Sequence, residues 1–263
     1  MKTHRQLSQR LLSTEDAQLS LHPLHVLFLD FENAFGSPDH DRLLEVLKYQ
    51  GFSEDALAAI RDLYPGGAEE VQPMMVSVRT TCGDTEEFPV RRGTIQGNTL
   101  SPLICILCID PRMHWLNSGN DGYTTATSGV RISSPAFADD MALLAGRVPA
   151  LARQLRKVEI YAVRGGLSLN VPKCAVGGIH VRALWERTYR YLRIGGGNIP
   201  FLLDYCPQTY LGVKIRLDLK WSNHVGMVCK QSGFDRAHIM HFTFYAITRS
   251  WHTHQKIRID EVA

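Results

Sequence analysis

Residues 137–144 read FADDMALL, and the interpretation of the whole chain starts from this stretch. Apolar residues flank the adjacent carboxylates of Asp139 and Asp140, with no Gly, Asn or Pro beside them. The pattern predicts two short strands, 130–137 and 141–144, joined by an acidic turn. Adjacent aspartates in a turn are most often solvent-facing turn formers, and that interpretation stays open here. The alternative is that the pair binds a cation.

A divalent cation would relieve the repulsion that such a pair creates. Two carboxylates about 4 Å apart repel by roughly 4 kcal/mol at an effective dielectric constant near 20. Hard carboxylate oxygens favour Mg²⁺ or Mn²⁺ over Zn²⁺. A third carboxylate, Asp30, lies in the apolar run VLFLDF at 26–31, which predicts a buried strand. If this strand neighbours the one at 132–144, three carboxylates meet at one end of a sheet and can hold two ions for in-line phosphoryl transfer.

The remaining pattern alternates helices and strands. Apolar stripes and capping residues predict helices over 37–49, 53–64, 102–116 and from 151 to Gly165. Apolar and polar residues that alternate along the chain predict a hairpin over 75–91. Strand-like segments follow at 167–171, 175–181 and 210–215. This order predicts an α+β fold in which helices pack on one face of a mostly antiparallel sheet.

Composition excludes several classes of protein. Apolar residues make up 44% of the 263 and charged residues 21%, which excludes a disordered or collagenous chain. The longest strongly apolar run has seven residues, 103–109, so no membrane span or membrane partner is expected. The first residues have no apolar segment of signal-peptide length, and we expect an intracellular protein, nuclear or cytoplasmic, whose six cysteines are reduced. Cys105 and Cys108 have CxxC spacing without a second pair, which favours helix packing over a metal site.

Charge divides the chain into two unlike parts. Residues 1–146 hold 11 Lys or Arg against 19 Asp or Glu, whereas residues 147–263 hold 18 against 7. This asymmetry suggests carboxylates gathered for a cation and a separate surface for a polyanion. Two differently solvated faces are the alternative.

Five short blocks spread over residues 26–215 form a further pattern. They are LDFENAF at 29–35, RGTIQGNTLSP at 92–102, FADD at 137–140, GLSLNVPKC at 166–174 and YLG at 210–212. In this order they resemble the successive palm motifs of reverse transcriptases, most closely those of non-LTR retrotransposons. The resemblance implies an RNA-directed DNA polymerase palm that transfers a nucleotide to a primer 3′-hydroxyl with two Mg²⁺ ions, or Mn²⁺ in their place.

The resemblance also implies catalytic roles for particular residues. Asp30, Asp139 and Asp140 match the catalytic metal ligands, with Asp140 the least direct of the three. Lys173 matches the lysine proposed as general acid to the leaving pyrophosphate. Without the resemblance, Lys173 is simply one more basic residue in the basic part of the chain.

Further matches concern the nucleotide and the primer. Phe35 matches the steric gate, whose ring would collide with a 2′-hydroxyl, although core packing is its plainer explanation. The segment 210–212 resembles the primer grip, or else is a strand that ends in a turn. The nucleotide-binding set implied by the resemblance is Phe31, Phe35, Gln96 and Gly97, and the primer-grip set is Tyr210, Leu211 and Gly212.

The resemblance gives an expected domain organisation. We expect an N-terminal leader without fingers motifs at 1–23, a palm at 24–216 and a truncated thumb or tail at 217–263. The implied partners are an RNA template, a DNA primer and dNTPs, together with a fingers-containing segment or longer polyprotein. Gly36 departs from the family pattern, in which Asp is common. Two alternatives remain: a catalytically inactive retroelement remnant that keeps the palm fold and nucleic-acid binding, and another palm-fold enzyme such as a nucleotide cyclase.

Overall fold

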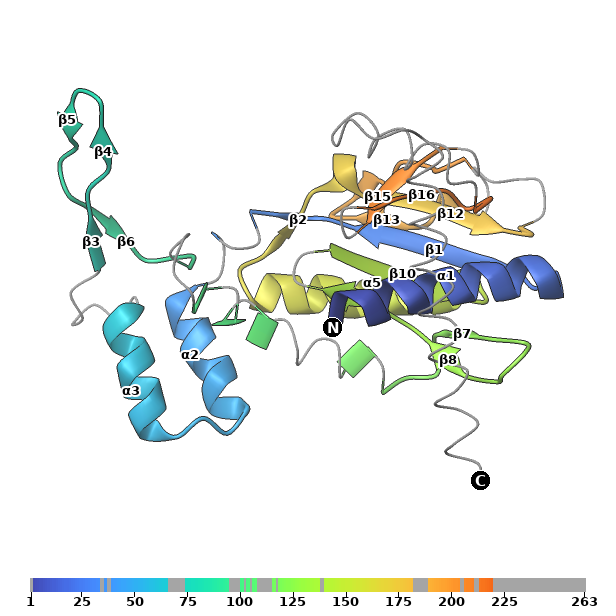
Figure 1. Cartoon of the computed structure of the whole chain (residues 1–263), viewed down its shortest axis with the longest axis horizontal. Helices are drawn as coiled ribbons and strands as arrows, with labels where there is room; N and C mark the ends of the chain where they lie inside the picture. Colours follow the sequence, from blue (N-terminus) through green and yellow to red (C-terminus); the bar gives the residue numbers. More distant parts are fainter. Residues whose placement is uncertain are drawn as a thin grey trace, which may run out of the picture.

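A four-stranded antiparallel sheet forms the centre of the molecule, with strand order β12-β1-β10-β9 (Figure 1). Its strands are β1 (Leu24–Leu29), β9 (Ala136–Phe137), β10 (Asp140–Ala145) and β12 (Ala175–Ile179). The computed structural model describes residues 2–33, 36, 39–65, 74–94, 100–101, 103–104, 106–107, 115–116, 118–137, 140–181, 189–203, 206–210 and 213–219. The expected α+β architecture with antiparallel strands is confirmed for these residues.

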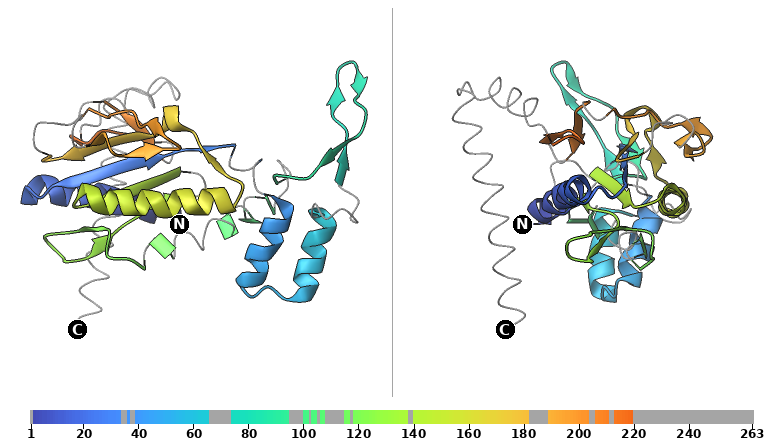
Figure 2. Two further views of the ribbon diagram at one scale, coloured as in Figure 1. Left: turned by 180° about the vertical axis from the view of Figure 1, so that it is seen from behind. Right: turned by 90° about the vertical axis from the view of Figure 1, so that its right-hand side faces the viewer.

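One helix covers each face of this sheet. The end-on view in Figure 2 shows α1 (Lys2–Ser20) on one side and α5 (Val148–Arg164) on the other. All six residues of β1 are buried, because both faces of the strand are covered. The expectation of helices on a single face is therefore wrong. It failed because the buried stripe of α1 contains polar residues, among them Arg10 and Thr14, which hide its periodicity.

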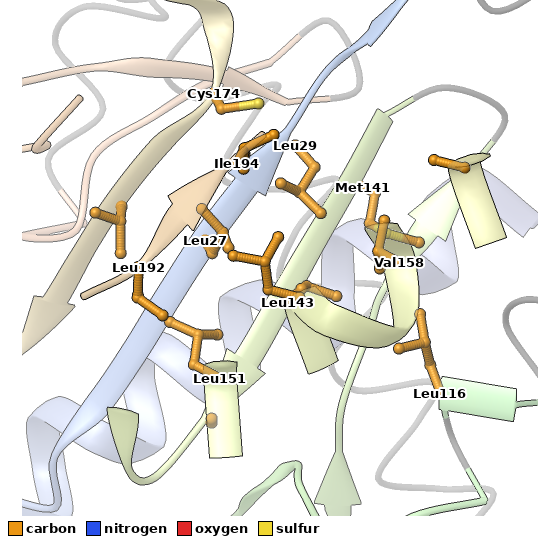
Figure 3. Close-up of a cluster of buried hydrophobic side chains, with 14 of the residues drawn as sticks. Leu27, Leu29, Leu116, Met141, Leu143, Leu151, Val158, Cys174, Leu192 and Ile194 are labelled. Carbon is orange, nitrogen blue, oxygen red and sulfur yellow. The ribbon is translucent and has the colours of Figure 1, made fainter. Parts of the chain in front are cut away.

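Alternation along β1 and β10 assigns the core residues to the two faces. Leu27 and Leu29 of β1, with Leu143 of β10, point toward α5 and pack against Leu151 and its neighbours (Figure 3). The alternate positions face α1, because successive side chains of a strand point to opposite faces. This second cluster contains Val26, Phe28, Ala142 and Leu144 together with Ala17 of α1. Each fully buried Leu stabilises the fold by roughly 1.5–3 kcal/mol.

A helix pair lies at one end of the sheet. It consists of α2 (His40–Tyr49) and α3 (Glu54–Leu63), which share a small core of their own (Figure 1). Ser53 caps α3 as expected, accepting a hydrogen bond from the Ala56 amide. Helix α2 is capped by Asp39, two residues later than the expected start at Ser37, which lies outside the described residues.

Beyond the helix pair, a hairpin arm projects away from the sheet (Figure 1). The predicted hairpin over 75–91 is confirmed as two paired segments, β3 (Met74–Val76) with β6 (Phe88–Val90), and β4 (Arg79–Thr80) with β5 (Gly83–Asp84).

Smaller strand pairs surround the sheet. They are β2 (Phe31–Glu32) with β11 (Ser168–Leu169), β7 (Tyr123–Thr124) with β8 (Arg131–Ile132), β13 (Arg193–Ile194) with β14 (Gly197–Asn198), and β15 (Gln208–Tyr210) with β16 (Val213–Ile215). The single strand expected at 210–215 is thus wrong, because the chain reverses within it. The helix expected at 102–116 lies largely outside the described residues. In the described part of the chain, no helix is long and apolar enough to cross a membrane.

Candidate active site

The register of β1 and β10 brings two of the predicted carboxylates together. Leu29 pairs with Met141, so Asp30 and Asp140 occupy the next position outward on neighbouring antiparallel strands. Both follow the alternation of the residues that face α1, Phe28 on β1 and Ala142 on β10. The condition set in the sequence analysis, that these two strands are neighbours, is met.

The third predicted carboxylate, Asp139, stands in the sequence between strands β9 and β10. Asp140 pairs with Phe137 across the β9–β10 hairpin, which leaves only Ala138 and Asp139 between the paired positions. Both turn residues lie outside the described residues. In the part that the structure describes, no group of three potential metal ligands is found. The oxygen donors of Asp30 and Asp140 nevertheless suit a hard divalent cation such as Mg²⁺.

A cavity of about 490 Å³ opens beside these carboxylates. It lies between the sheet, the turn that follows β11 and the segment that precedes β15. Polar and apolar surface contribute about equally to its wall, which includes the charged residues Asp30, Asp140 and Lys173. The lining residues are Phe28, Leu29, Asp30, Asp140, Met141, Pro172, Lys173, Cys174, Ala175, Pro200, Phe201, Leu202, Gln208, Thr209 and Tyr210.

Lys173 approaches the first carboxylate from the short 3-10 helix η1 (Val171–Lys173). Its Nζ lies 3.8 Å from Oδ2 of Asp30, and its side chain is 69% exposed. The backbone amide of Asn170 donates to the Asp30 carbonyl at 2.9 Å and fixes this turn beside the strand. The neighbouring thiol of Cys174 is buried, and burial raises its pKa, which keeps it protonated and unreactive. The structure therefore places Lys173 beside Asp30 in the wall of this cavity.

Tyr210 of β15 also forms part of the cavity wall. Its ring is buried, and its hydroxyl donates to the Pro135 carbonyl at 2.7 Å. Burial raises the pKa of this phenol, so it remains a neutral donor. The hydrogen bond holds β15 against the segment that leads into β9. Leu211 and Gly212, the other two residues expected in the primer grip, lie outside the described residues.

The start of the second motif block is packed against the end of the first. Gly93 has φ +83°, and a Cβ at this position would lie 2.7 Å from the Cα of Gly36. The buried His40 ring bonds the Gly93 carbonyl at 2.8 Å. This close approach of two backbones requires glycine at position 93, whereas a Cβ at Gly36 would meet the side chain of Asn33, 2.1 Å from its Nδ2. Phe35, Gln96 and Gly97, three of the expected nucleotide-binding residues, lie outside the described residues.

Phe31 lies apart from the cavity. Its side chain is 4% exposed and packs in the core on the α5 side of the sheet. It follows Leu27 and Leu29 in the alternation, which turns it away from the face that carries Asp30. Its expected contact with a nucleotide stays a prediction.

Sequence reasoning missed two charged residues of α1 that lie near this face. Arg10 packs over Phe28, with its Cζ 4.7 Å from the ring centroid. Asp16 is buried and accepts four hydrogen bonds from Tyr123, Ala126 and Thr127. Arg10, Thr14 and Ala17 recur at helical intervals, but two of the three are polar, so the sequence pattern did not mark this face as buried.

Comparison with known proteins identifies the family of this chain. A family model described as "Reverse transcriptase (RNA-dependent DNA polymerase)" matches residues 1–215. The chain belongs to this reverse transcriptase family. The Pol polyprotein of the type-1 element R2 of Popillia japonica is 29% identical over 155 residues, which cover 57% of this chain and 24% of the polyprotein. That of the type-2 element R2DM of Drosophila melanogaster is 27% identical over 192 residues, which cover 72% of the chain and 17% of the polyprotein.

The fold is also similar to that of solved telomerase structures. Telomerase from Candida tropicalis, in complex with a fragment of telomeric RNA, matches with a TM-score of 0.54 at 12% identity. The match covers 85% of this chain and 34% of the telomerase chain. The chain thus spans about a quarter or less of the length of these two polyproteins and about a third of this telomerase.

Proposed function

We propose that this chain carries the palm of an RNA-directed DNA polymerase. In the proposed reaction, a primer 3′-hydroxyl attacks the α-phosphorus of a dNTP and pyrophosphate leaves. The observation that carries the proposal is the convergence of Asp30, Asp140 and Lys173 on one cavity. The retroelement relatives and the family match support the same activity.

Each charged residue has a distinct part in this proposal. Asp30, Asp139 and Asp140 would hold two Mg²⁺ ions, which supply charge stabilisation for the attacking and leaving oxygens. Asp30 directly follows β1, and its carbonyl accepts from the Asn170 amide at 2.9 Å, which fixes the backbone that carries its carboxylate. Lys173, with an exposed ammonium 3.8 Å from Asp30, would deliver a proton to the departing pyrophosphate.

Other residues would position the nucleic acid and the nucleotide. Tyr210, Leu211 and Gly212 would hold the primer end, since Tyr210 lines the same cavity as Asp30, Asp140 and Lys173. Phe35, Gln96 and Gly97 would contact the incoming nucleotide. Phe31, which is buried, would support this site by packing beneath it. The proposed partners are an RNA template, a DNA primer and dNTPs, with additional polymerase segments supplied by a longer polyprotein such as those of the relatives.

A primer-extension assay tests the proposal directly. Purified chain is incubated with poly(rA)·oligo(dT), dTTP and Mg²⁺ or Mn²⁺, and product length is measured. We expect extension in the chain itself and a loss of about 100-fold or more in Asp30→Asn and Asp140→Asn, since each change removes a carboxylate that would hold the metal ions, whose positive charge stabilises the transition state. The matched control is Asp84→Asn, an exposed carboxylate in the hairpin arm, which should retain activity.

Two outcomes would count against the polymerase assignment. Extension that survives in Asp30→Asn would show that this carboxylate is not part of the site. Tight binding of the RNA·DNA hybrid with no extension under any metal condition would favour a remnant that keeps only nucleic-acid binding.

A further inference from the structure

Arg10 is an unexpected component of the described core. Its side chain is completely buried, and Nε, Nη1 and Nη2 have no hydrogen-bond partner among the residues that the structure describes. Burial lowers the pKa of Arg10 to about 10, so the guanidinium still carries its charge at neutral pH. A buried cation without a partner is strongly destabilising, and an apolar residue of the same length would serve packing better. The charge therefore calls for an explanation beyond packing.

The position of Arg10 relates it to the carboxylate site. Its guanidinium lies 4.7 Å from the ring centroid of Phe28 and 5.8 Å from that of Tyr210. Both rings line the cavity that contains Asp30 and Asp140, whereas Arg10 is not among the lining residues. The positive charge thus contacts two rings of the cavity wall without reaching the cavity. Stacking on the two rings offsets part of the cost of burial.

Arg10 and the two carboxylates belong to the same face of the sheet. Asp30 and Asp140 follow the alternation of the residues that face α1, and Arg10 projects from α1 onto the same face. The rings of Phe28 and Tyr210, on which the guanidinium lies, line the same cavity as Asp30 and Asp140, and electrostatic interactions inside a protein are less screened than in water. A fixed positive charge on this face attracts the two carboxylates and so reduces the cost of holding them close together. The same charge repels a divalent cation bound by these carboxylates.

We propose that Arg10 is a positioning residue of the carboxylate site, an internal countercharge that holds the acidic groups together and limits how tightly the site binds a divalent cation. This inference rests on the proposed function, because it takes Asp30 and Asp140 as cation ligands. The residue acts through its charge and through the rings of Phe28 and Tyr210, without contact with substrate.

The test measures cation affinity in the absence of catalysis. Mn²⁺ is titrated into the full chain at about pH 8, where carboxylates are ionised, and free Mn²⁺ is followed by electron paramagnetic resonance. Arg10→Met removes the charge and keeps much of the volume, and Arg10→Lys keeps the charge as the matched control. We expect Arg10→Met to bind Mn²⁺ about threefold to tenfold more tightly, since one repulsive charge is gone, and Arg10→Lys to bind as the unmodified chain does.

Thermal unfolding of the same variants completes the test. Arg10→Met should be folded, with a midpoint equal to or above that of the unmodified chain, because an unpaired buried charge has been removed. Unchanged Mn²⁺ affinity in a folded Arg10→Met variant would overturn the inference and leave the proposed function intact. Loss of the fold in this variant would also overturn it, since the guanidinium would then serve structure.

A control on the site itself separates the two proposals. Mn²⁺ binding that is present in the unmodified chain and lost in Asp30→Asn identifies the carboxylate site. If the unmodified chain binds no Mn²⁺, the metal site of the proposed function fails, and the countercharge inference fails with it.

Discussion

His25 on β1 is a histidine that the fold keeps neutral. Its side chain is 6% exposed, and its Nδ1 lies 2.6 Å from the hydroxyl of Tyr189, which also donates to the Gly177 carbonyl at 3.2 Å. Burial lowers the pKa of His25 to about 4. In the unfolded chain the same residue would accept a proton near pH 6.5. Folding therefore competes with protonation of this single side chain.

This competition predicts a pH dependence of stability. The contribution of neutral His25 is fully present above about pH 6.5 and is lost progressively as the pH falls toward about 4, by up to about 3 kcal/mol. His25→Phe should remove this part of the pH dependence, whereas exposed His22→Gln should keep it. Urea unfolding between about pH 7 and about pH 4 measures the effect. Equal pH profiles for His25→Phe and the unmodified chain would contradict the prediction.

The proposed role of Asp139 rests on the sequence, because this residue lies outside the described residues. The sequence assigns it as a metal ligand by resemblance, and the structure describes the strands on either side of it. We expect Asp139→Asn to weaken Mn²⁺ binding by about tenfold or more, because a carboxylate is a much stronger ligand for a hard cation than an amide. Calorimetric titration measures this, with Asp84→Asn as the control. An unchanged affinity would remove Asp139 from the site.

At the scale of elements, helix α1 is tied to the β7–β8 hairpin through Asp16. One carboxylate oxygen accepts from the Tyr123 hydroxyl at 2.7 Å and the Ala126 amide at 2.8 Å. The other accepts from the amide and hydroxyl of Thr127 at 3.0 and 2.7 Å. Although burial opposes ionisation, these hydrogen bonds together hold the pKa of Asp16 below its usual range. The carboxylate thus fixes the helix that supplies Arg10.

This connection predicts the effect of one conservative change. Each carboxylate oxygen of Asp16 accepts two hydrogen bonds, and Asp16→Asn replaces one oxygen by an NH₂ group, which cannot accept them. We expect a loss of about 2–4 kcal/mol of unfolding free energy. Exposed Glu15→Gln should cost almost nothing. In the unmodified chain, the contribution of Asp16 is present above about pH 4 and is lost as the pH falls through its lowered pKa. Denaturant unfolding of the two variants checks the difference, and similar midpoints would contradict it.

The elements also show what the sequence could and could not predict. Strand β1 and the β9–β10 hairpin were predictable, because unbroken apolar runs next to acidic residues have few alternatives. Helix α3 was predictable from its Ser53 cap. Helix α1 was not, since its buried face includes Arg10 and Asp16, whose burial depends on partners remote in sequence. The sequence predicted that Asp30 and Asp140 meet only if their two strands are neighbours. The register of β1 and β10 shows that they are.

At the scale of the whole molecule, charge is distributed unevenly along the chain. Residues 147–263 carry 18 Lys or Arg against 7 Asp or Glu, whereas the carboxylates concentrate before them. We expect binding of an RNA·DNA hybrid to be mostly electrostatic, with affinity falling by about 0.7–0.9 log units per neutralised phosphate for each decade of salt. Fluorescence anisotropy over a salt series measures this slope. An affinity that does not change with salt would exclude a basic binding surface.

The tight β9–β10 hairpin limits how the gene can change in this region. Asp140 begins β10, and every second residue after it belongs to the same face. Loss of a single codon between Met141 and Ala145 would leave either the apolar residues or the acidic one on the wrong side of the sheet. Loss of two adjacent codons would shorten the strand but keep its alternation. In this short stretch, a six-nucleotide deletion should therefore be milder than a three-nucleotide one.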